Sequence, residues 1–180
     1  MHRLFVALRP PRDIRALLIA AMGGVRAARW QDDEQLHLTL RFIGEVDRPV
    51  AEDVAAALGS VHAPPITAAI AGVGRFDRRG RTDAIWAGVA PGDALAALHA
   101  KVDRALVRLG LDPERRAYLP HITLARLPRA GGSEHEVERF LADHAGLASP
   151  PFAFTHLTLF ESRLGQEGAR YTPVTRWPLG

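Results

Sequence analysis

The segment Gln35–Phe42 (QLHLTLRF) alternates strictly between polar and apolar side chains. Such alternation predicts a β-strand with one apolar face for the core and one polar face. Residues two apart on a strand point to the same side, so His37 and Thr39 are presented together. The His-x-Thr-Leu motif occurs three times, more often than chance predicts, at His37–Leu40, His121–Leu124 and His156–Leu159.

The elements predicted around the first two motifs repeat in the same order. Each half of the chain reads as strand, amphipathic helix, His-x-Thr-Leu strand, short helix and hairpin. Two such copies, approximately residues 1–80 and 81–180, predict a single bilobal domain of residues 1–180. A pseudo-two-fold axis between the copies is expected to bring His37 and His121 face to face. The predicted elements are strand 4–8, helix 14–25, strand 35–43, helix 50–58, strands 66–76 and 84–89, helix 93–109, strand 121–127, helix 134–144 with Ser133 as its cap, and strands 152–160 and 170–177.

The third motif does not occupy the same place in the repeat. No short helix follows His156, and its strand corresponds to strand 66–76 of the first half. Three phenylalanines flank the motif, at positions 152, 154 and 160. We therefore interpret His156 as a buried or rim histidine and set it aside from the pair.

Composition bounds the class of protein. The chain has 180 residues, 47% apolar and 24% charged, which suits a globular protein with a sizeable core. No apolar run reaches the roughly 18 residues that a membrane span needs, and the first residues do not resemble a secretory signal. The chain has no Cys, which excludes disulfides and thiolate metal sites and suits a cytoplasmic enzyme.

The basic residues give mild support for a partner that carries phosphate. The net charge is only +3, and all of the 23 Lys and Arg residues except Lys101 are Arg. Such a bias is also typical of a GC-rich genome. Arginine is nonetheless the better phosphate ligand, because it is permanently charged and binds in a bidentate manner.

Paired histidines and threonines suit a displacement at phosphorus. The pKa of histidine lies near neutral pH, so one ring can take a proton from a nucleophile while the other donates one to a leaving oxygen. A hydroxyl beside each ring can donate to a phosphate oxygen as charge develops there. No metal or other cofactor is required by this design. A structural alternative stays open on the pattern alone, because repeats can also conserve packing.

The flanking residues extend the motif to a family resemblance. The segments LFVALRPP, HLTLRFIGEV, PHITLAR and LTLFESRLGQEGARYTPVTRWPL together resemble the bacterial and archaeal RNA 2′,3′-cyclic phosphodiesterases, also called 2′-5′ RNA ligases, of the two-histidine phosphoesterase superfamily. The resemblance covers essentially the whole chain. It implies a bilobal α+β fold with two antiparallel sheets lining a central cleft and helices outside. It also implies metal- and ATP-independent opening of a terminal 2′,3′-cyclic phosphate to a 2′-phosphate, with 2′-5′ ligation as an accompanying activity.

Carried over residue by residue, the resemblance makes His37 and His121 the general acid and base. We favour His37 as the acid for the leaving 3′-oxygen and His121 as the base for water. Six residues are predicted for the site: His37 and His121 as catalysts, and Thr39, Thr123, Arg126 and Arg41 as substrate ligands. Strict alternation places Arg126 on the face opposite His121, so a bulge or strand end must redirect it, whereas alternation favours Arg41 for the cleft.

Other candidates and functions stay weaker. Arg75, Arg78, Arg79 and Arg81 cluster on a predicted hairpin loop that suits an RNA backbone or simply a solvated turn. His135 and His144 lack a zinc-binding spacing. The expected partner is an RNA end bearing a 2′,3′-cyclic phosphate, without a membrane, and the chain is expected to be a monomer. The alternatives are a non-catalytic RNA-binding module and a phosphodiesterase of small cyclic nucleotides.

Overall fold

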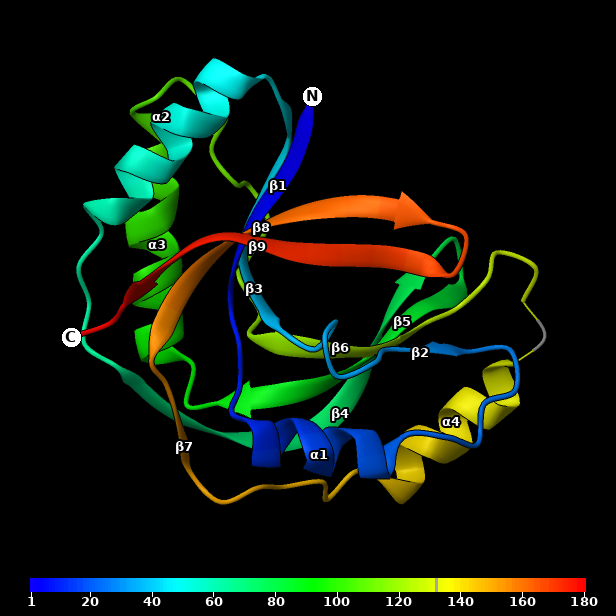
Figure 1. Ribbon diagram of the computed structural model, residues 1–180. Coiled ribbons are helices and arrows are strands. Elements are labelled where there is room, and N and C mark those ends of the chain that lie inside the picture. Colours follow the sequence, from blue (N-terminus) through cyan, green and yellow to red (C-terminus); the bar gives the residue numbers. More distant parts are fainter. Residues whose placement is uncertain (132) are drawn as a thin grey trace.

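The strands of this protein join in one antiparallel sheet. Figure 1 shows the computed structural model of the chain, which describes residues 1–131 and 133–180. Within these ranges nine strands are present. Their bounds are β1 His2–Leu8, β2 Arg29–Trp30, β3 Leu38–Val46, β4 Ile66–Arg78, β5 Arg81–Ala90, β6 His121–Arg126, β7 Phe152–Phe154, β8 His156–Gly165 and β9 Gly168–Pro178.

The helices of the described residues are α1 Arg12–Ala21, α2 Arg48–Gly59, α3 Asp93–Val107 and α4 Glu134–Asp143. The predicted α+β class is therefore confirmed. The Asp47 side chain begins α2 by accepting a hydrogen bond of 3.0 Å from the Val50 amide. Ser133 stands at the corresponding position of α4, but its hydroxyl makes no capping bond, because its backbone lacks the extended conformation that aims a cap. None of these four helices is long and apolar enough to cross a membrane.

The strand order is symmetric about its middle. The sheet runs β7-β4-β5-β6-β3-β1-β8-β9, and β2 pairs with β6. We call β3, β1, β8 and β9 the first lobe, and β6, β5, β4, β7 and β2 the second lobe. In the described part of the chain, β3 and β6 pair through a single pair of residues, Leu38 with Ile122. The two sheets expected from the sequence are thus two arms that meet at one point.

The lobes do not coincide with the two halves of the sequence. β4 belongs to the first half but pairs with β5 in the second lobe. β8 and β9 belong to the second half, and β8 pairs with β1 in the first lobe. The exchange of β4 follows from a tight hairpin, whose turn residues Arg79 and Gly80 have φ of 53° and 74°. Each lobe is therefore built by both halves.

The segment 152–160, predicted as one strand, is two strands that join opposite lobes. Phe154 at the end of β7 pairs with Ile66 of β4, whereas β8 pairs with β1. The chain passes from one lobe to the other at Thr155, between the two strands. The apolar positions change parity here, from Phe152 and Phe154 to Leu157 and Leu159, but the two runs are so close in sequence that they read as one strand.

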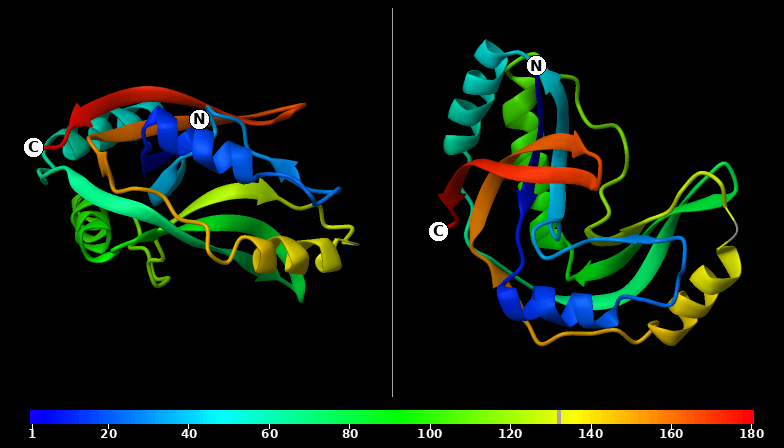
Figure 2. Two further views of the ribbon diagram at one scale, coloured as in Figure 1. Left: turned by 90° about the horizontal axis from the view of Figure 1, so that it is seen from below. Right: turned by 45° about the vertical axis from the view of Figure 1, so that its right-hand side comes forward.

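Helices cover the outer faces of the lobes. α2 and α3 lie side by side and pack on β1 and β3, and α4 packs on β5 (Figures 1 and 2). Val54 and Leu58 of α2 and Val102 of α3 are fully buried in this layer. Burying an aliphatic side chain of this size contributes about 1.5–3 kcal/mol. The helices thus hold β3 from outside and leave its polar face directed away from the core.

Gly88 of β5 lies opposite His121 of β6 and has no room for a side chain. A Cβ at this position would lie 2.4 Å from the carbonyl oxygen of Ala71, where β4 bulges over it. Because that oxygen belongs to the backbone, it cannot rotate away. We expect Gly88→Ala to lower the free energy of unfolding by about 2 kcal/mol or more, measured by urea denaturation. Gly146→Ala is the control, since nothing lies within 4 Å of its new Cβ, and equal stability of the two variants would contradict the expectation.

Candidate active site

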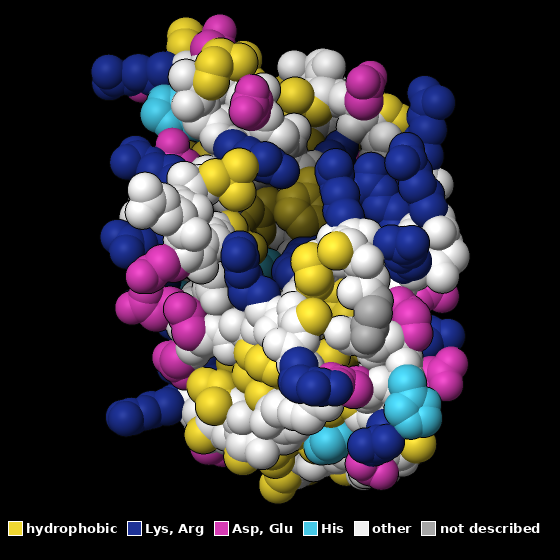
Figure 3. Space-filling model, turned by 90° about the vertical axis from the view of Figure 1, so that its right-hand side faces the viewer, with side chains coloured by type: hydrophobic (Ala, Val, Ile, Leu, Met, Phe, Trp, Pro, Cys, Tyr) yellow, Lys and Arg dark blue, Asp and Glu magenta, His cyan; other side chains and the backbone are white. Residues whose placement is uncertain are grey.

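The two His-x-Thr pairs line one cavity. This central cavity has a volume of about 610 Å³, and its wall includes His37, Thr39, His121, Thr123 and Arg126. The size is that of a small-ligand pocket. On the face turned to the viewer in Figure 3, the surface is hollowed, hydrophobic side chains show inside the hollow, and Lys and Arg side chains gather beside it.

The register of β3 and β6 places each histidine across from the other lobe's threonine. Leu38 pairs with Ile122 in an antiparallel ladder. Continuing that register by one residue in each direction sets His37 opposite Thr123 and Thr39 opposite His121. The four side chains therefore surround the single point where the lobes are joined.

Both imidazole rings are held in the same way. Nδ1 of His37 donates to the carbonyl oxygen of Gln35 at 2.7 Å, and Nδ1 of His121 donates to that of Leu119 at 2.7 Å. A carbonyl can only accept, so each neutral ring carries its proton on Nδ1 and leaves Nε2 as an acceptor. The Thr39 hydroxyl donates to Nε2 of His37 at 3.0 Å. Two strands thus present two equivalent ring nitrogens.

Aromatic rings enclose both histidines. Phe5 and Tyr171 lie 4.9 Å and 5.1 Å from the His37 ring, measured between centroids. Phe76 and Trp86 lie 4.8 Å and 6.0 Å from the His121 ring. Phe5 and Trp86 come from β1 and β5, the strands that correspond in the two lobes. The enclosure is therefore part of the internal repeat.

This enclosure favours the neutral form of both rings. Burial lowers the pKa of His37 from 6.5 to about 4, against the opposing effect of its bond to Gln35. Burial also lowers the pKa of His121. The positive charge of Arg126 adds to the lowering at both rings. In the free protein at neutral pH, both histidines are consequently uncharged.

Arg126 lies in the central cavity because β6 bulges. Thr123 pairs with Trp86, but Ala125 pairs with Ile85, so Leu124 is an extra residue in the strand. Leu124 and Ala125 are both fully buried, and strict alternation is broken between them. The bulge turns Arg126 to the side of His121, as the resemblance required.

The equivalent bulge in β3 leaves Arg41 buried. Thr39 pairs with Ala7 and Arg41 with Val6, which leaves Leu40 as the extra residue. Leu40 and Arg41 are therefore both buried, with exposed fractions of 2% and 7%, and the position that corresponds to Arg126 is held by Phe42. Arg41 still lines the central cavity, as alternation predicted, and its role as a substrate ligand stays a prediction.

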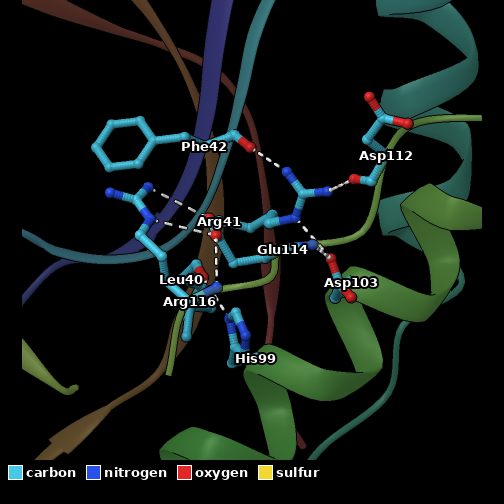
Figure 4. A network of polar contacts seen from close by, with 8 residues as sticks. All are labelled: Leu40, Arg41, Phe42, His99, Asp103, Asp112, Glu114 and Arg116. Carbon is cyan, nitrogen blue, oxygen red and sulfur yellow. Dashed lines mark hydrogen bonds and ion pairs between the residues drawn. The ribbon is translucent and has the colours of Figure 1, made fainter. Parts of the chain in front are cut away.

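The guanidinium of Arg41 is bound within the protein (Figure 4). Its Nε donates to a carboxylate oxygen of Asp103 at 2.7 Å, and its other nitrogens donate to the carbonyl oxygens of Phe42 and Asp112. Asp103 also accepts a hydrogen bond of 3.1 Å from the Glu114 amide. Arg41 is part of the cavity wall, and its guanidinium anchors the loop after α3 to β3.

That loop supplies a wall of the cavity that the sequence did not indicate. Tyr118 donates to the carbonyl oxygen of Thr39 at 3.2 Å and stacks on His99 with centroids 4.3 Å apart. His99 in turn bonds the carbonyl oxygen of Leu40 at 2.6 Å. Burial raises the pKa of Tyr118, which keeps its hydroxyl a donor. The segment 111–120 has no periodicity that could have marked these contacts.

The remaining histidine candidates, His156, His135 and His144, lie outside the cavity. His156 is bonded through Nδ1 to the hydroxyl of its neighbour Thr155 at 2.9 Å. His135 contacts Arg139 one turn along α4, and His144 bonds the carbonyl oxygen of Phe140. Among the residues that the structure describes, no three His, Cys, Asp or Glu side chains are placed to hold a metal ion.

Comparisons with known proteins identify the family of this chain. The sequence profile of the 2'-5' RNA ligase superfamily matches residues 10–166. The RNA 2',3'-cyclic phosphodiesterase of Aeropyrum pernix is 39% identical over 100 residues, a match that spans 55% of this chain and 57% of that protein. The protein of the same name from Escherichia coli is 30% identical over 187 residues, covering 99% and 97% of the two chains.

Comparison of the fold with solved structures indicates the same family. The crystal structure of E. coli LigT complexed with 3'-AMP matches with a TM-score of 0.76 and 27% identity, covering 99% of this chain and 98% of that one. Two lobes with paired His-x-Thr strands define the class of two-histidine phosphoesterases. Within that class, this chain belongs to the 2'-5' RNA ligase superfamily, and the family predicted from the sequence is confirmed.

Substitutions distinguish the expected effect of Arg126 on catalysis from that of Arg41 on stability. We expect Arg126→Gln to lower kcat/KM for a 2′,3′-cyclic phosphate at least tenfold, since it removes a cation from the cavity, while stability changes by less than about 0.5 kcal/mol. We expect Arg41→Gln to lower the free energy of unfolding by about 2 kcal/mol, because it leaves the partly buried carboxylate of Asp103 without its cation. Kinetic assays and urea denaturation of both variants measure the difference. Full stability of Arg41→Gln would contradict the anchoring role.

Proposed function

We propose that this protein opens terminal 2′,3′-cyclic phosphates of RNA to 2′-phosphates, with His37 and His121 as general acid and base and without metal or ATP. One observation carries the proposal: the two Nε2 atoms enter a single cavity from equivalent positions, each fixed by a bond from Nδ1 to the carbonyl two residues earlier. The relatives named RNA 2',3'-cyclic phosphodiesterase support the same activity and favour an enzyme over a non-catalytic RNA-binding module.

The reaction needs one proton transfer at each ring. The base takes a proton from water as the water oxygen bonds to phosphorus. The bond between phosphorus and the 3′-oxygen breaks, and the acid donates a proton to that oxygen. The products are a 3′-hydroxyl and a 2′-phosphate. A 5′-hydroxyl in place of water gives a 2′-5′ linkage by the same steps, with no ATP.

The other proposed ligands stabilise charge on the phosphate. The hydroxyls of Thr39 and Thr123 lie on opposite strands, diagonally across the β3–β6 junction, and suit the two non-bridging oxygens. Arg126 lowers the pKa of both rings and is therefore close enough to act on an anion between them. Donors already in place cost little reorganisation when negative charge develops.

We retain His37 as the acid and His121 as the base. His37 is the more enclosed ring, with Phe5 at 4.9 Å and Tyr171 at 5.1 Å, whereas the His121 ring is nearer to solvent and can be reached by water. The depressed pKa of His37 makes its protonated form a strong acid. An anionic phosphodiester bound beside the ring raises that pKa, so substrate binding and protonation are coupled.

Substitution of each histidine tests whether the two act as a catalytic pair. We expect His37→Ala and His121→Ala each to lower kcat about 10²- to 10⁴-fold, since each removes one proton transfer. His156→Ala is the matched control and should keep full activity, because its ring lies outside the cavity. Hydrolysis of an oligonucleotide 2′,3′-cyclic phosphate in buffer with EDTA measures all three. Full activity in either of the first two variants would contradict the pair.

The same variants assign the two roles. A substrate with sulfur in place of the 3′-oxygen has a leaving group that needs no proton. We expect this substrate to restore turnover to His37→Ala but not to His121→Ala. Rescue of His121→Ala alone would reverse the assignment.

The pH dependence follows from the lowered pKa values. The active form carries one proton on the pair. In the free enzyme, activity is therefore lost at acid pH, where both rings are protonated, and towards neutral pH, where both are neutral because burial lowers the pKa of each. We expect kcat/KM to be highest between these limits and to fall as the pH rises through 6.5. Because a bound phosphodiester raises both pKa values, kcat should persist to higher pH. A kcat/KM that increases through neutral pH would contradict this account.

RNA ends are the proposed substrate, and the active unit is proposed to be one chain. Both rings and both threonines of the cavity come from a single chain, so no second copy is needed to complete it. We propose a monomer whose residues 1–180 form one domain, acting in the cytoplasm, where a protein without Cys needs no oxidising conditions. Turnover of an oligonucleotide end compared with a mononucleotide 2′,3′-cyclic phosphate separates an RNA enzyme from one acting on small nucleotides.

A further inference from the structure

A second hollow lies at the tip of the β4–β5 hairpin, outside the two histidine motifs. It has a volume of about 400 Å³. The hairpin contributes Arg78, Arg79 and Arg81 to its wall, and the segment after β6 contributes Pro128 and Arg129. We call it the hairpin-tip hollow.

The hairpin-tip hollow is contiguous with the central cavity. Arg78 and Asp83 line both spaces. The two spaces are therefore neighbours on the β4–β5 hairpin, with Arg78 and Asp83 at their shared boundary.

The hairpin-tip hollow carries an excess of positive charge. Its wall holds four arginines and one carboxylate, that of Asp83. The Arg81 guanidinium donates to the carbonyl oxygen of Arg129 at 2.9 Å, and that neutral acceptor does not remove its charge. Across the described residues, no ion pair within 4.0 Å involves Arg78, Arg79 or Arg129.

The nearby carboxylates offset only part of this charge, because Glu134 interacts electrostatically with Arg75 as well as with Arg81. Glu134 accepts hydrogen bonds of 2.8 Å from both the amide and the hydroxyl of Thr82, and Arg75 lies 3.8 Å from it. Arg75 also lies 3.5 Å from Asp77. Both acids are thus occupied by partners beside the hairpin.

The opposite side of the central cavity is electrically balanced. There, Arg116 lies 3.3 Å from Glu114, and Arg41 lies 2.7 Å from Asp103. A polyanion leaving the cavity on that side would meet paired charges. On the hairpin side it meets the arginines of the hairpin-tip hollow. Figure 3 shows Lys and Arg side chains gathered on the face of the molecule that is turned to the viewer.

We propose that the hairpin-tip hollow binds the backbone phosphates of the RNA segment that precedes the cyclic end. The inference rests on the proposed function. A 2′,3′-cyclic phosphate occupies the 3′ terminus, so the chain continues only on the 5′ side of the nucleotide in the central cavity. Arginine suits the phosphates of a single strand, because it binds in a bidentate manner and keeps its charge. The hollow thus makes the enzyme prefer oligonucleotide ends over mononucleotides.

The test compares two substrates and two double variants. The substrates are an oligonucleotide ending in a 2′,3′-cyclic phosphate and cytidine 2′,3′-cyclic phosphate. Arg79→Gln/Arg129→Gln removes two cations of the hollow, and Gln is no more strained than Arg at the φ of 53° of position 79. Arg104→Gln/Arg108→Gln, on exposed positions of α3 and just after it, removes the same charge elsewhere.

We expect the first variant to raise KM for the oligonucleotide about tenfold near 0.1 M salt and to reduce the salt slope of log(kcat/KM) by roughly 1.4, at about 0.7 per phosphate contact. Turnover of cytidine 2′,3′-cyclic phosphate should stay unchanged. The α3 variant should alter neither substrate's KM by more than about twofold. Equal KM for the oligonucleotide in wild type and Arg79→Gln/Arg129→Gln would overturn the inference, and so would equal effects of the two variants.

A second measurement uses the wild-type protein, so it does not depend on the folding of a variant. An oligonucleotide whose last internucleotide linkages are neutral methylphosphonates should lose the KM advantage over the mononucleotide. An unchanged KM would overturn the inference. Failure of the wild type to hydrolyse both the oligonucleotide and cytidine 2′,3′-cyclic phosphate would instead contradict the proposed function, so the two failures are distinguishable.

Discussion

The pairing of Leu38 with Ile122 sets the geometry of the whole site. Full pairing of β3 with β6 would hold their backbones about 4.8 Å apart and close the space between their polar faces. Pairing at one point instead lets the strands diverge while fixing their register. The two apolar side chains are fully buried, so the junction also belongs to the core. Position and separation of the catalytic groups therefore derive from the same contact that joins the lobes.

Enclosure and charge act together on the imidazoles. Aromatic walls lower the pKa of both rings, and Arg126 lowers it further. The free cavity thus holds neutral rings beside a permanent cation, an arrangement that attracts an anion. Binding of that anion then favours protonation of the ring that must act as acid. Hydrophobic packing, which stabilises the fold, here also keeps the acid uncharged until the substrate arrives.

Strand alternation and the order of elements predicted the His-x-Thr faces and the repeat, and the resemblance of the flanking segments predicted the family. Alternation could not predict where it is itself interrupted. The bulges at Leu40 and Leu124 insert one residue into each motif strand. Hydrophobic patterning does not reveal them, because a Leu fits the apolar pattern whether or not the strand bulges at that residue. For this reason alternation did not predict that the Arg41 side chain is buried, and the prediction of Arg126 for the cavity required the family resemblance. The change of lobe at Thr155 was not predicted, because the partner with which a strand pairs depends on residues far away in the sequence. Contacts of the loop after α3 depend on tertiary packing alone.

The exchange of β4 and β8 between the lobes bears on how such a molecule could arise by duplication. A half-length ancestor with one His-x-Thr strand would leave its last strand with no partner of its own. Two copies would complete each other by swapping that strand, and the pair would already carry two facing motifs. Fusion of the copies into one chain would change the connection but not the sheet. The continuous order β7-β4-β5-β6-β3-β1-β8-β9 is the pattern that a fused, strand-swapped dimer leaves behind.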